Sequence, residues 1–401
     1  MTALIHFPIV NLLGIITFAI WLHLFFGRGW FWRVRKMDAD RSSIEAVQNW
    51  PSVVAIVPAR NEAETIQEVL TSLVRQDYPG KFSIVIVDDH SEDATASIAN
   101  QVSQESGTAA QVVVLSAAEL QPGWTGKLSA LNSGVSAIDP RSTKEHGVPE
   151  APAYYWFTDA DISHAPDTLR GLMSHAEQDE LDLASLMVLL QAKTLPERAL
   201  IPAFLYFFLM LYPPKWTTDE DLGTAGAAGG CILLKREALA RVGGLAAIRS
   251  EVIDDCALAK AVKQTGGKVW MGLTRKSVSL RNYDSFTEIQ DLVARTAFTQ
   301  LRYSPLLLAG TLAGMLLTYI SPIALLFAPD PTAKILGLAA WVFMSFSFLP
   351  TVRFYRLSPL WAPLLPAIAA FYTYATYLSA VRYWRGKGGQ WKGRSQARKA
   401  A

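Results

Sequence analysis

The chain has 401 residues, which is room for more than one domain and excludes a single small module. Its 37 Lys and Arg against 35 Asp and Glu give a net charge of +2, without the basic excess that binding to nucleic acid requires. Hydrophobic residues make up 51% and charged residues only 18%, against about 25% charged in soluble globular proteins, so the composition indicates a membrane protein.

The first apolar segment runs from Phe7 to Phe26, about 20 uncharged residues, which is enough to cross roughly 30 Å of hydrocarbon. A cleaved signal peptide is the alternative, but the run is long, no Lys or Arg precedes it, and no A-x-A site follows. A retained anchor is therefore predicted. Basic and aromatic residues typical of a cytoplasmic membrane surface come next: Arg28, Trp30, Trp32, Arg33, Arg35 and Lys36.

Residues from about 50 to 300 alternate between strand and helix patterns, which predicts an α/β fold with a mostly parallel sheet covered on both faces. The apolar runs Ser52–Ala59, Phe82–Val87 and Val112–Leu115 are expected to be its first strands. Asn61 with Glu64 three residues later predicts a capping box at the start of the first helix.

Polar residues follow these strands where a ligand of such a sheet would bind, beyond the carboxyl ends. They are Arg60, Glu62, Asp88 and Asp89. The chain contains neither G-x-G-x-x-G nor G-x-x-x-x-G-K-[ST], so neither the usual dinucleotide fingerprint nor a P-loop is supported.

Five short motifs occur in order along this part of the chain: VPARNE (57–62), VDDHSED (87–93), GKLSALNSG (126–134), DAD (159–161) and IDDCALAKAVKQTG (253–266). In this order and at this spacing they resemble the inverting GT-A glycosyltransferases of family 2. The resemblance covers about residues 50–300. It implies a Rossmann-like GT-A domain that transfers a sugar from a nucleotide sugar, expected to be a UDP-sugar, with the help of a divalent metal ion.

The D-x-D motif places Asp159 and Asp161 on one turn after the strand pattern YYWFT. Mg²⁺ and Mn²⁺ take oxygen ligands and complete their shell with phosphates, so one or two carboxylates suffice. By resemblance Asp161 would coordinate the metal, and Asp159 would contact the nucleotide or support the ion. An acidic loop without a metal is the alternative.

The resemblance also implies a set of nucleotide-sugar-binding residues. Asp88 would bind the nucleotide, with a helix-capping acidic pair as the alternative. Lys127 would bring a charge to a phosphate, or it is a solvated surface lysine. Arg302 would approach the diphosphate, or it extends its charge from a membrane helix to the interface. The complete set is Pro58, Arg60, Glu62, Asp88, Asp89, Lys127, Asp159 and Arg302.

Asp254 and Asp255 open a helix pattern, and inverting transfer needs one base to take the proton of the acceptor hydroxyl. In the family this pair is usually Glu-Asp, so by resemblance Asp255 is the base and Asp254 its support. A plain acidic helix start is the alternative. Gly229 and Gly230 belong to a glycine-rich segment that fits an acceptor loop, although these glycines could equally serve packing.

Processive members of the family carry Q-x-x-R-W, whereas residues 299–303 here are TQLRY. The Gln is out of register and the Trp is replaced, which favours a single transfer onto a lipid over polymer synthesis. The segments FLYFFLMLYPP (204–214) and AGAAGGCILL (225–234) resemble the hopene-associated glycosyltransferases of bacterial hopanoid biosynthesis. That resemblance implies a polycyclic triterpenoid or related lipid as acceptor.

Two other interpretations remain open. One is a polyisoprenyl-phosphate sugar synthase or polysaccharide synthase of the same fold, and the other is a non-catalytic membrane scaffold. The intact acidic set argues against the scaffold.

Further apolar stretches crowd the C-terminus at Tyr303–Pro329, Ile335–Val352 and Leu357–Val381. Ala199–Pro214, at about 16 residues, is expected to be too short to cross and to lie in the membrane interface, with a buried core helix as the alternative. Four spans would place the basic tail on the outer side, against the positive-inside bias. Ile335–Val352 is therefore expected to be the weakest span. The prediction is one N-terminal and two to three C-terminal transmembrane helices, with three full spans plus a re-entrant or interfacial piece as one possibility.

The predicted organisation is a membrane anchor and basic linker (1–48), a GT-A domain (49–302) with an interfacial helix (199–214), a C-terminal membrane region (303–384) and a basic tail (385–401). The expected location is the bacterial inner membrane, multi-pass, with the catalytic domain in the cytoplasm.

Overall fold

The computed structural model describes residues 2–34, 47, 49–105, 111–138, 151–386, 390–391 and 394–395. The chain divides into a helical unit (1–34, 192–215 and 282–389) and an α/β unit (35–191 and 216–281, with the tail from residue 390). In the tail, β9 (Gln390–Trp391) pairs antiparallel with β10 (Arg394–Ser395). Most of the predicted basic linker, with Arg35 and Lys36, and most of the basic tail lie outside the described residues.

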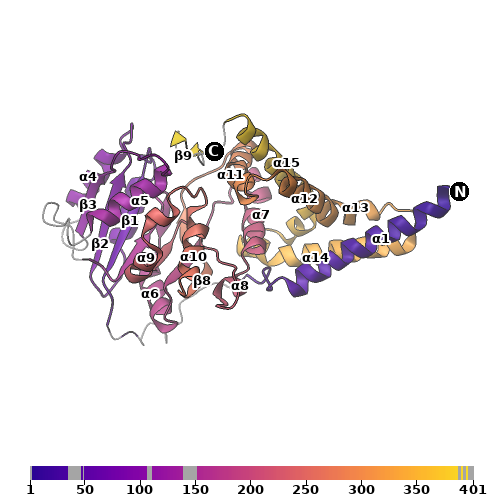
Figure 1. The fold of residues 1–401 in the computed structure, drawn as a ribbon, viewed down its shortest axis with the longest axis horizontal. Coiled ribbons are helices and arrows are strands. Elements are labelled where there is room, and N and C mark those ends of the chain that lie inside the picture. The colour runs from indigo at the N-terminus through magenta and orange to yellow at the C-terminus, as the bar shows by residue number, and fades with distance from the viewer. Residues whose placement is uncertain are drawn as a thin grey trace. The chain divides into compact units, whose positions relative to one another are not determined.

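An eight-stranded sheet forms the centre of the α/β unit, with the strand order β3-β2-β1-β4-β7-β6-β8-β5 (Figure 1). Neighbours among β3, β2, β1 and β4 are parallel, as are β6 and β8, whereas β7 and β5 run antiparallel to their neighbours. The predicted α/β fold with a mostly parallel sheet is confirmed. The strands are β1 (Val53–Ala59), β2 (Phe82–Asp88), β3 (Gln111–Ser116), β4 (Tyr154–Phe157), β5 (Ile162–His164), β6 (Leu183–Leu189), β7 (Ile232–Lys235) and β8 (Val269–Ser279).

Helices cover both faces of this sheet, because successive side chains of a strand point to opposite sides. Val53, Ala55 and Val57 of β1 pack into one core, and Val54 and Ile56 pack into the other. The first core is covered by α3 (Ile66–Val74), α4 (Thr95–Glu105) and α6 (Thr168–Gln178). The second is covered by α5 (Gly126–Ala137), α9 (Arg236–Val242), the 3₁₀ turn η2 (Leu245–Ile248) and α10 (Asp254–Gln264).

The predicted capping box at Asn61 is wrong, since α3 begins only at Ile66 and no side chain caps it. Asn61 instead adopts a left-handed backbone conformation with φ of 52°. Its N–H donates to Ser91 Oγ at 3.0 Å, and its Oδ1 accepts from Glu92 N at 2.8 Å. Asn61 therefore ties the loop after β1 to the loop after β2, at the edge where the site was expected.

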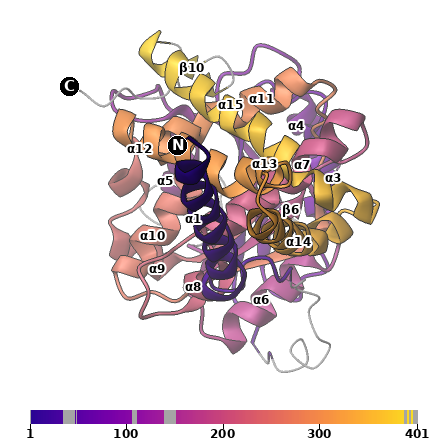
Figure 2. The same ribbon diagram turned by 90° about the vertical axis from the view of Figure 1, so that its right-hand side faces the viewer.

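The helical unit contains the apolar segments of both chain ends. Helix α1 and helix α14 lie side by side in both views (Figure 1 and Figure 2). The helices are α1 (Thr2–Leu22) with the π-helical turn η1 (His23–Gly27), α7 (Leu195–Leu211), α11 (Phe286–Gln300), α12 (Pro305–Met315) with the π-helical turn η3 (Leu316–Ile320) and α13 (Ser321–Leu325), α14 (Pro331–Phe354), and the 3₁₀ turn η4 (Pro359–Leu364) with α15 (Leu365–Trp384). Within the described residues, five helical segments are long and apolar enough to cross a membrane.

Helix α14 corrects the expectation of a weak span at Ile335–Val352. It is one continuous helix of 24 residues, with Pro350 inside it. At 1.5 Å per residue it reaches about 36 Å, longer than the hydrocarbon core. Asp330 caps it by accepting from Thr332 N and Ala333 N. The uncharged run is shorter than the helix because it is bounded by Lys334 and Arg353, which lie in the terminal turns of the helix.

Helix α7 is continued by the short α8 (Pro214–Thr218), and together they form one of the five segments. The strands before α7 and those after it belong to the same sheet. A single crossing by α7 would separate these hydrogen-bonded strands across a membrane, so the sheet topology argues against it. Tyr206, in the middle of α7, is buried and bonds Ser347 Oγ of α14 at 2.7 Å. This packing favours the buried helix, and the interfacial position stays a prediction.

Gly134 allows α5 to lie close on the sheet, and we expect Gly134→Ala to destabilise the α/β unit. A Cβ at this position would lie 2.6 Å from Ile56 Cγ2 and 3.0 Å from Val87 Cγ2, both branched side chains in buried strands. Overpacking of this kind costs about 1–3 kcal/mol. The better helix propensity of Ala returns about 1 kcal/mol. The midpoint of thermal unfolding should therefore fall.

The matched control is Ser136→Ala, at an exposed position of the same helix. This change should leave the unfolding midpoint unchanged or raise it slightly, because Ala is the better helix former. Equal midpoints for Gly134→Ala and Ser136→Ala would contradict the close packing of α5 on β1 and β2.

Candidate active site

The carboxyl ends of three parallel strands bring the predicted polar residues to one edge of the sheet. Ala59 at the end of β1 pairs with Asp88 at the end of β2, and Ile56 of β1 pairs with Phe157 at the end of β4. The loops that begin at these points carry Arg60 and the D-x-D motif. Sequence positions about 30 and 100 residues apart therefore share one edge, as the parallel topology predicts.

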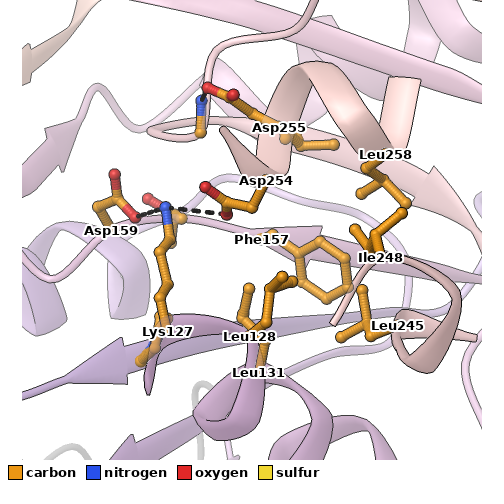
Figure 3. A pocket seen from close by; sticks show the side chains of 14 residues that line it. Lys127, Leu128, Leu131, Phe157, Asp159, Leu245, Ile248, Asp254, Asp255 and Leu258 are labelled. Atoms are coloured by element: carbon orange, nitrogen blue, oxygen red, sulfur yellow. Dashed lines mark hydrogen bonds and ion pairs between the residues drawn. The ribbon is translucent and has the colours of Figure 1, made fainter. Parts of the chain in front are cut away.

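A lysine connects the D-x-D motif with the predicted base pair. Lys127 Nζ lies 2.7 Å from Asp159 Oδ1 and 3.5 Å from Asp254 Oδ2. In Figure 3 its side chain extends from α5 toward both carboxylates. Burial alone would lower the pKa of Lys127, but the charges of Asp159, Asp254 and Asp255 outweigh it and hold the pKa above its ordinary value. Lys127 is therefore a largely enclosed cation of the site, with its side chain 16% exposed, and the solvated surface lysine is excluded.

Asp255, in the first turn of α10, is held by two backbone donors. Gly229 N–H donates to its Oδ2 at 2.8 Å, and Cys256 N–H donates to its Oδ1 at 2.7 Å. Burial raises the pKa of Asp255 to about 6, and the charge of Asp254 adds to this rise, whereas Lys127 and the two N–H groups oppose it. This aspartate is ionised at neutral pH but is a stronger base than an exposed one.

Two charged groups of the site approach the backbone of Gly229 so closely that they leave little room for a side chain. A Cβ added there would lie 3.0 Å from Lys127 Nζ and 3.4 Å from Asp255 Oδ2. A Cβ added at the neighbouring Gly230 would lie 3.2 Å from Val188 Cγ2 and 3.3 Å from Ile162 Cγ1. The predicted glycine loop is therefore part of the site, and its glycines also serve packing.

Asp161 lies in a region of excess negative charge. Burial raises its pKa to about 6, and the charges of Asp159 and Glu62 add to the rise, while Arg281 and Lys127 oppose it. The described residues contain no cluster of three or more His, Cys, Asp or Glu that could hold a metal. Asp159 and Asp161 fit a divalent cation all the same, because such an ion completes its shell with phosphate and water and would neutralise this excess charge.

Below these charges the pocket has an apolar floor (Figure 3). Low polarity on one side of the carboxylates strengthens the electrostatic interactions within the pocket. Pro58, Thr158 and Gly229 also line it. The floor consists of Leu128, Leu131, Phe157, Leu245, Ile248 and Leu258.

Asp88 is buried, and only one of its two carboxylate oxygens is bonded within the described residues. Its Oδ2 accepts from Ser91 N at 3.3 Å, and its buried Oδ1 has no hydrogen-bond partner there. A buried acceptor without a donor carries a free-energy cost that a ligand can remove. The arrangement is consistent with the predicted nucleotide-binding role.

Arg60 and Asp89 hold the site loops together. Arg60 Nη1 donates to the carbonyls of Asp89 and His90 at 2.5 and 2.9 Å, and its Nη2 lies 3.3 Å from Glu92 Oε1. The Asp89 N–H donates to Ala59 O at 2.8 Å. These contacts are structural, and nucleotide binding by Arg60 and Asp89 stays a prediction.

Two further predicted residues have different outcomes. Glu62 contributes to the charge around Asp161, and its N–H donates to Thr95 Oγ1 at 2.8 Å. Arg302 belongs to the helical unit, so its predicted contact with the diphosphate stays a prediction. Sequence reasoning missed Arg281, whose charge acts on Asp161, because no motif contains it.

Comparison with known proteins agrees with this geometry. Residues 54–243, just under half of the chain, match the family model described as Glycosyl transferase family 2, so this part of the chain is similar to the glycosyltransferase domains of that family. The chain is 33% identical over 91 residues to the probable glycosyltransferase YdaM of Bacillus subtilis (strain 168), which is 22% of this chain and 21% of that protein. It is 44% identical over 54 residues to glycosyltransferase AglE of Haloferax volcanii, which is 13% of this chain and 18% of that protein.

These curated relatives are matched over only about a fifth of their length. Among solved structures, the mannosyltransferase PcManGT from Pyrobaculum calidifontis, in complex with GDP-Man and Mn²⁺, superposes with a TM-score of 0.55 at 19% identity. The match covers 93% of this chain and 99% of that chain. At this identity the likeness shows a shared fold.

The charges of the site make a prediction about stability and pH. We expect Lys127→Met to lower the unfolding midpoint more at pH 8 than at pH 5. Asp161 and Asp255 have pKa values of about 6, above the ordinary carboxyl value of about 4. The stability that they contribute is therefore complete below pH 4 and is lost as the pH rises through about 6. Lys127 limits this loss by compensating the ionised carboxylates.

Thermal unfolding of both proteins at the two pH values checks this, with Lys260→Met as the control. Lys260 is exposed on α10, so its variant should differ from the wild type equally at both pH values. If Lys127→Met also lowered the midpoint equally at both pH values, the result would contradict the role of Lys127 as the compensating cation among the carboxylates.

Proposed function

We propose that the chain is a membrane-bound inverting glycosyltransferase that moves a sugar from a nucleotide sugar, a UDP-sugar by expectation, to a membrane lipid. The observation that carries this proposal is the convergence of Lys127, Asp159, Asp254 and Asp255 on one pocket at the carboxyl edge of the sheet. The match to the family 2 model supports the same reaction class.

Asp255 is the base in this reaction. The acceptor oxygen attacks the anomeric carbon from behind, the bond to the diphosphate oxygen breaks, and Asp255 takes the hydroxyl proton. A pKa of about 6 suits this task, because the group is ionised at neutral pH and still accepts a proton readily. The N–H groups of Gly229 and Cys256 orient the carboxylate, and Asp254 is the supporting neighbour.

Asp161, with Asp159 beside it, would hold Mg²⁺ or Mn²⁺. The excess negative charge that raises the pKa of Asp161 supports this assignment. When bound, the ion would offset the charge of the departing nucleoside diphosphate. Lys127 supplies a second positive charge from the protein itself, 2.7 Å from Asp159. The archaeal mannosyltransferase of the same fold was solved with GDP-Man and Mn²⁺, which supports a similar donor here.

A lipid acceptor follows from the apolar helices. Of the five segments long enough to cross a membrane, α1 precedes the α/β unit and three follow it in the chain, so the pocket is tethered to a bilayer. The resemblance to hopene-associated enzymes favours a polycyclic triterpenoid or related lipid at the inner leaflet. We place the protein in the bacterial inner membrane, with the α/β unit in the cytoplasm.

Product analysis tests this proposal. The purified protein in lipid nanodiscs is incubated with UDP-sugars, Mn²⁺ and bacterial lipid extracts with and without hopanoids, and the lipids are analysed by mass spectrometry. A hopanoid that gains the mass of one sugar is expected. Products on polyisoprenyl phosphate, or a ladder of polymer products, would favour the polyisoprenyl-phosphate sugar synthase or polysaccharide synthase. A protein that neither binds any donor nor transfers its sugar would favour the non-catalytic membrane scaffold.

The role of Asp255 predicts that Asp255→Asn abolishes transfer while donor binding persists. Loss of a general base lowers kcat by about 100-fold or more. The Asn side chain keeps an oxygen acceptor for the Gly229 N–H and loses only the acceptor for the Cys256 N–H, so the pocket should keep its overall shape. Transfer assays and isothermal titration with the UDP-sugar and Mn²⁺ measure the two quantities. Asp221→Asn, at an exposed aspartate, is the control, and normal turnover of Asp255→Asn would refute the assignment.

The role of Asp161 predicts that Asp161→Ala loses the metal-dependent part of donor binding. In the wild type the affinity for the UDP-sugar should rise on addition of Mn²⁺, and in the variant it should not. Isothermal titration with and without the metal checks this. Asp179→Ala, at a half-exposed aspartate after α6, should behave as the wild type. A retained response to Mn²⁺ in Asp161→Ala would overturn the metal assignment.

A further inference from the structure

The turn over residues 228–231, called here the glycine turn, carries the N–H group that holds the base. Gly229 N–H donates to Asp255 Oδ2 at 2.8 Å. Glycines give a backbone more conformational freedom than other residues, so the turn needs support to keep this donor in place. Buried polar side chains form hydrogen bonds with the backbone of this turn.

Ser185 of β6 supports the first part of the glycine turn. Its Oγ accepts from Ala228 N at 2.8 Å and donates to Ala228 O at 3.2 Å. The Ala228 carbonyl belongs to the same planar peptide unit as the Gly229 N–H. Ser185 therefore helps to set the direction of the donor that faces Asp255.

A chain of three buried side chains supports the other end of the glycine turn. Thr158 Oγ1 donates to Gly230 O at 3.0 Å and lies 2.8 Å from His164 Nε2. His164 Nδ1 lies 2.8 Å from Ser277 Oγ, in the residue paired with it across β5 and β8. The ring of Trp156 packs on the imidazole with centroids 4.7 Å apart. Thr158, His164 and Ser277 are all buried.

The protons of this chain can be assigned by counting donors. The one hydroxyl proton of Thr158 goes to Gly230 O, so Thr158 accepts from His164 Nε2–H. His164 Nδ1 is then the acceptor for the Ser277 hydroxyl. Burial lowers the pKa of His164 to about 3, so the ring is neutral and has one N–H, as this assignment requires. Each donor in this series of hydrogen bonds has one acceptor, and each donates in the direction of the glycine turn.

We propose that His164 and Ser277, acting through Thr158, are positioning residues that fix the Gly230 carbonyl and thereby hold the Gly229 N–H against the base. The inference rests on the proposed function, because it concerns the orientation of Asp255 in transfer. None of the three side chains contacts Asp255 directly in the described residues, so their effect passes through the backbone of the glycine turn.

This arrangement has a kinetic signature that general destabilisation lacks. The Gly229 N–H stabilises the ionised form of Asp255, so a displaced turn raises the pKa of Asp255. The acid limb of kcat then moves to higher pH, and kcat falls. The charged groups facing Asp255 are Asp254 of its own helix and Lys127 of α5, and the substitutions leave both unchanged. Thr158 lines the pocket but is not among the residues assigned to the donor, so KM for the donor should change much less than kcat.

The experiment compares Thr158→Val and Thr158→Ser in the full-length protein in nanodiscs, once the wild type has been shown to transfer sugar. Thr158→Val keeps the shape but removes the hydroxyl, and kcat should fall about 10-fold to 100-fold, the usual effect of a small misplacement of a reacting group. The acid limb should move to higher pH, with KM for the donor changing much less than kcat. Thr158→Ser restores the hydroxyl and should restore kcat and the pH limb.

Ser277→Ala is the milder second variant, in case Thr158→Val does not fold. It removes only the outermost hydroxyl and should shift kcat and the acid limb in the same direction by less. Ser174→Ala, which removes a buried hydroxyl of α6, is the control for lost stability and should match the wild type in both.

Two results would overturn the inference. One is wild-type kcat and pH dependence in Thr158→Val, or in Ser277→Ala if Thr158→Val does not fold. The other is an equal loss in Thr158→Ser and Thr158→Val. A wild-type protein that transfers no sugar would instead refute the proposed function.

Discussion

The ion pairing of the Lys127 ammonium group with Asp159 and Asp254 is the interaction on which the site depends. Asp159 follows β4, Asp254 opens α10, and neither segment could bring its carboxylate into one apolar pocket without a nearby positive charge. Lys127 supplies that charge from the start of α5, a helix that packs closely on the sheet through Gly134. Packing of one helix and the electrostatics of the pocket are therefore linked.

The residues of the site come partly from before α7 and partly from after it in the sequence, and the sheet topology brings the two groups together. The residues proposed to bind the donor come from the ends of β1, β2 and β4 before α7, and the proposed base comes from α10 after it. The antiparallel β7 joins them, because it pairs with β4 and begins directly after the glycine turn. This connection explains why a base about 95 residues from the D-x-D motif reaches the same pocket.

Much of this arrangement could be predicted from the sequence. Continuous apolar runs marked β1 and β2, and acidic residues after them and at the start of α10 marked the site, because parallel strands share one carboxyl edge. Other features depend on tertiary contacts that leave no local pattern. Asn61 has the spacing of a capping residue, yet it joins two loops. His164 resembles any loop histidine until Thr158 and Ser277 are seen on its two nitrogens.

The central claim is that the acidic residues and Lys127 surround one sugar nucleotide. An experimental structure of the protein with a UDP-sugar analogue and Mn²⁺ tests it most directly. The account predicts the diphosphate beside Lys127, the metal at Asp161, and the anomeric carbon facing Asp255. A nucleotide bound elsewhere, or a sugar that leaves Asp255 on the far side of the pocket, would contradict it.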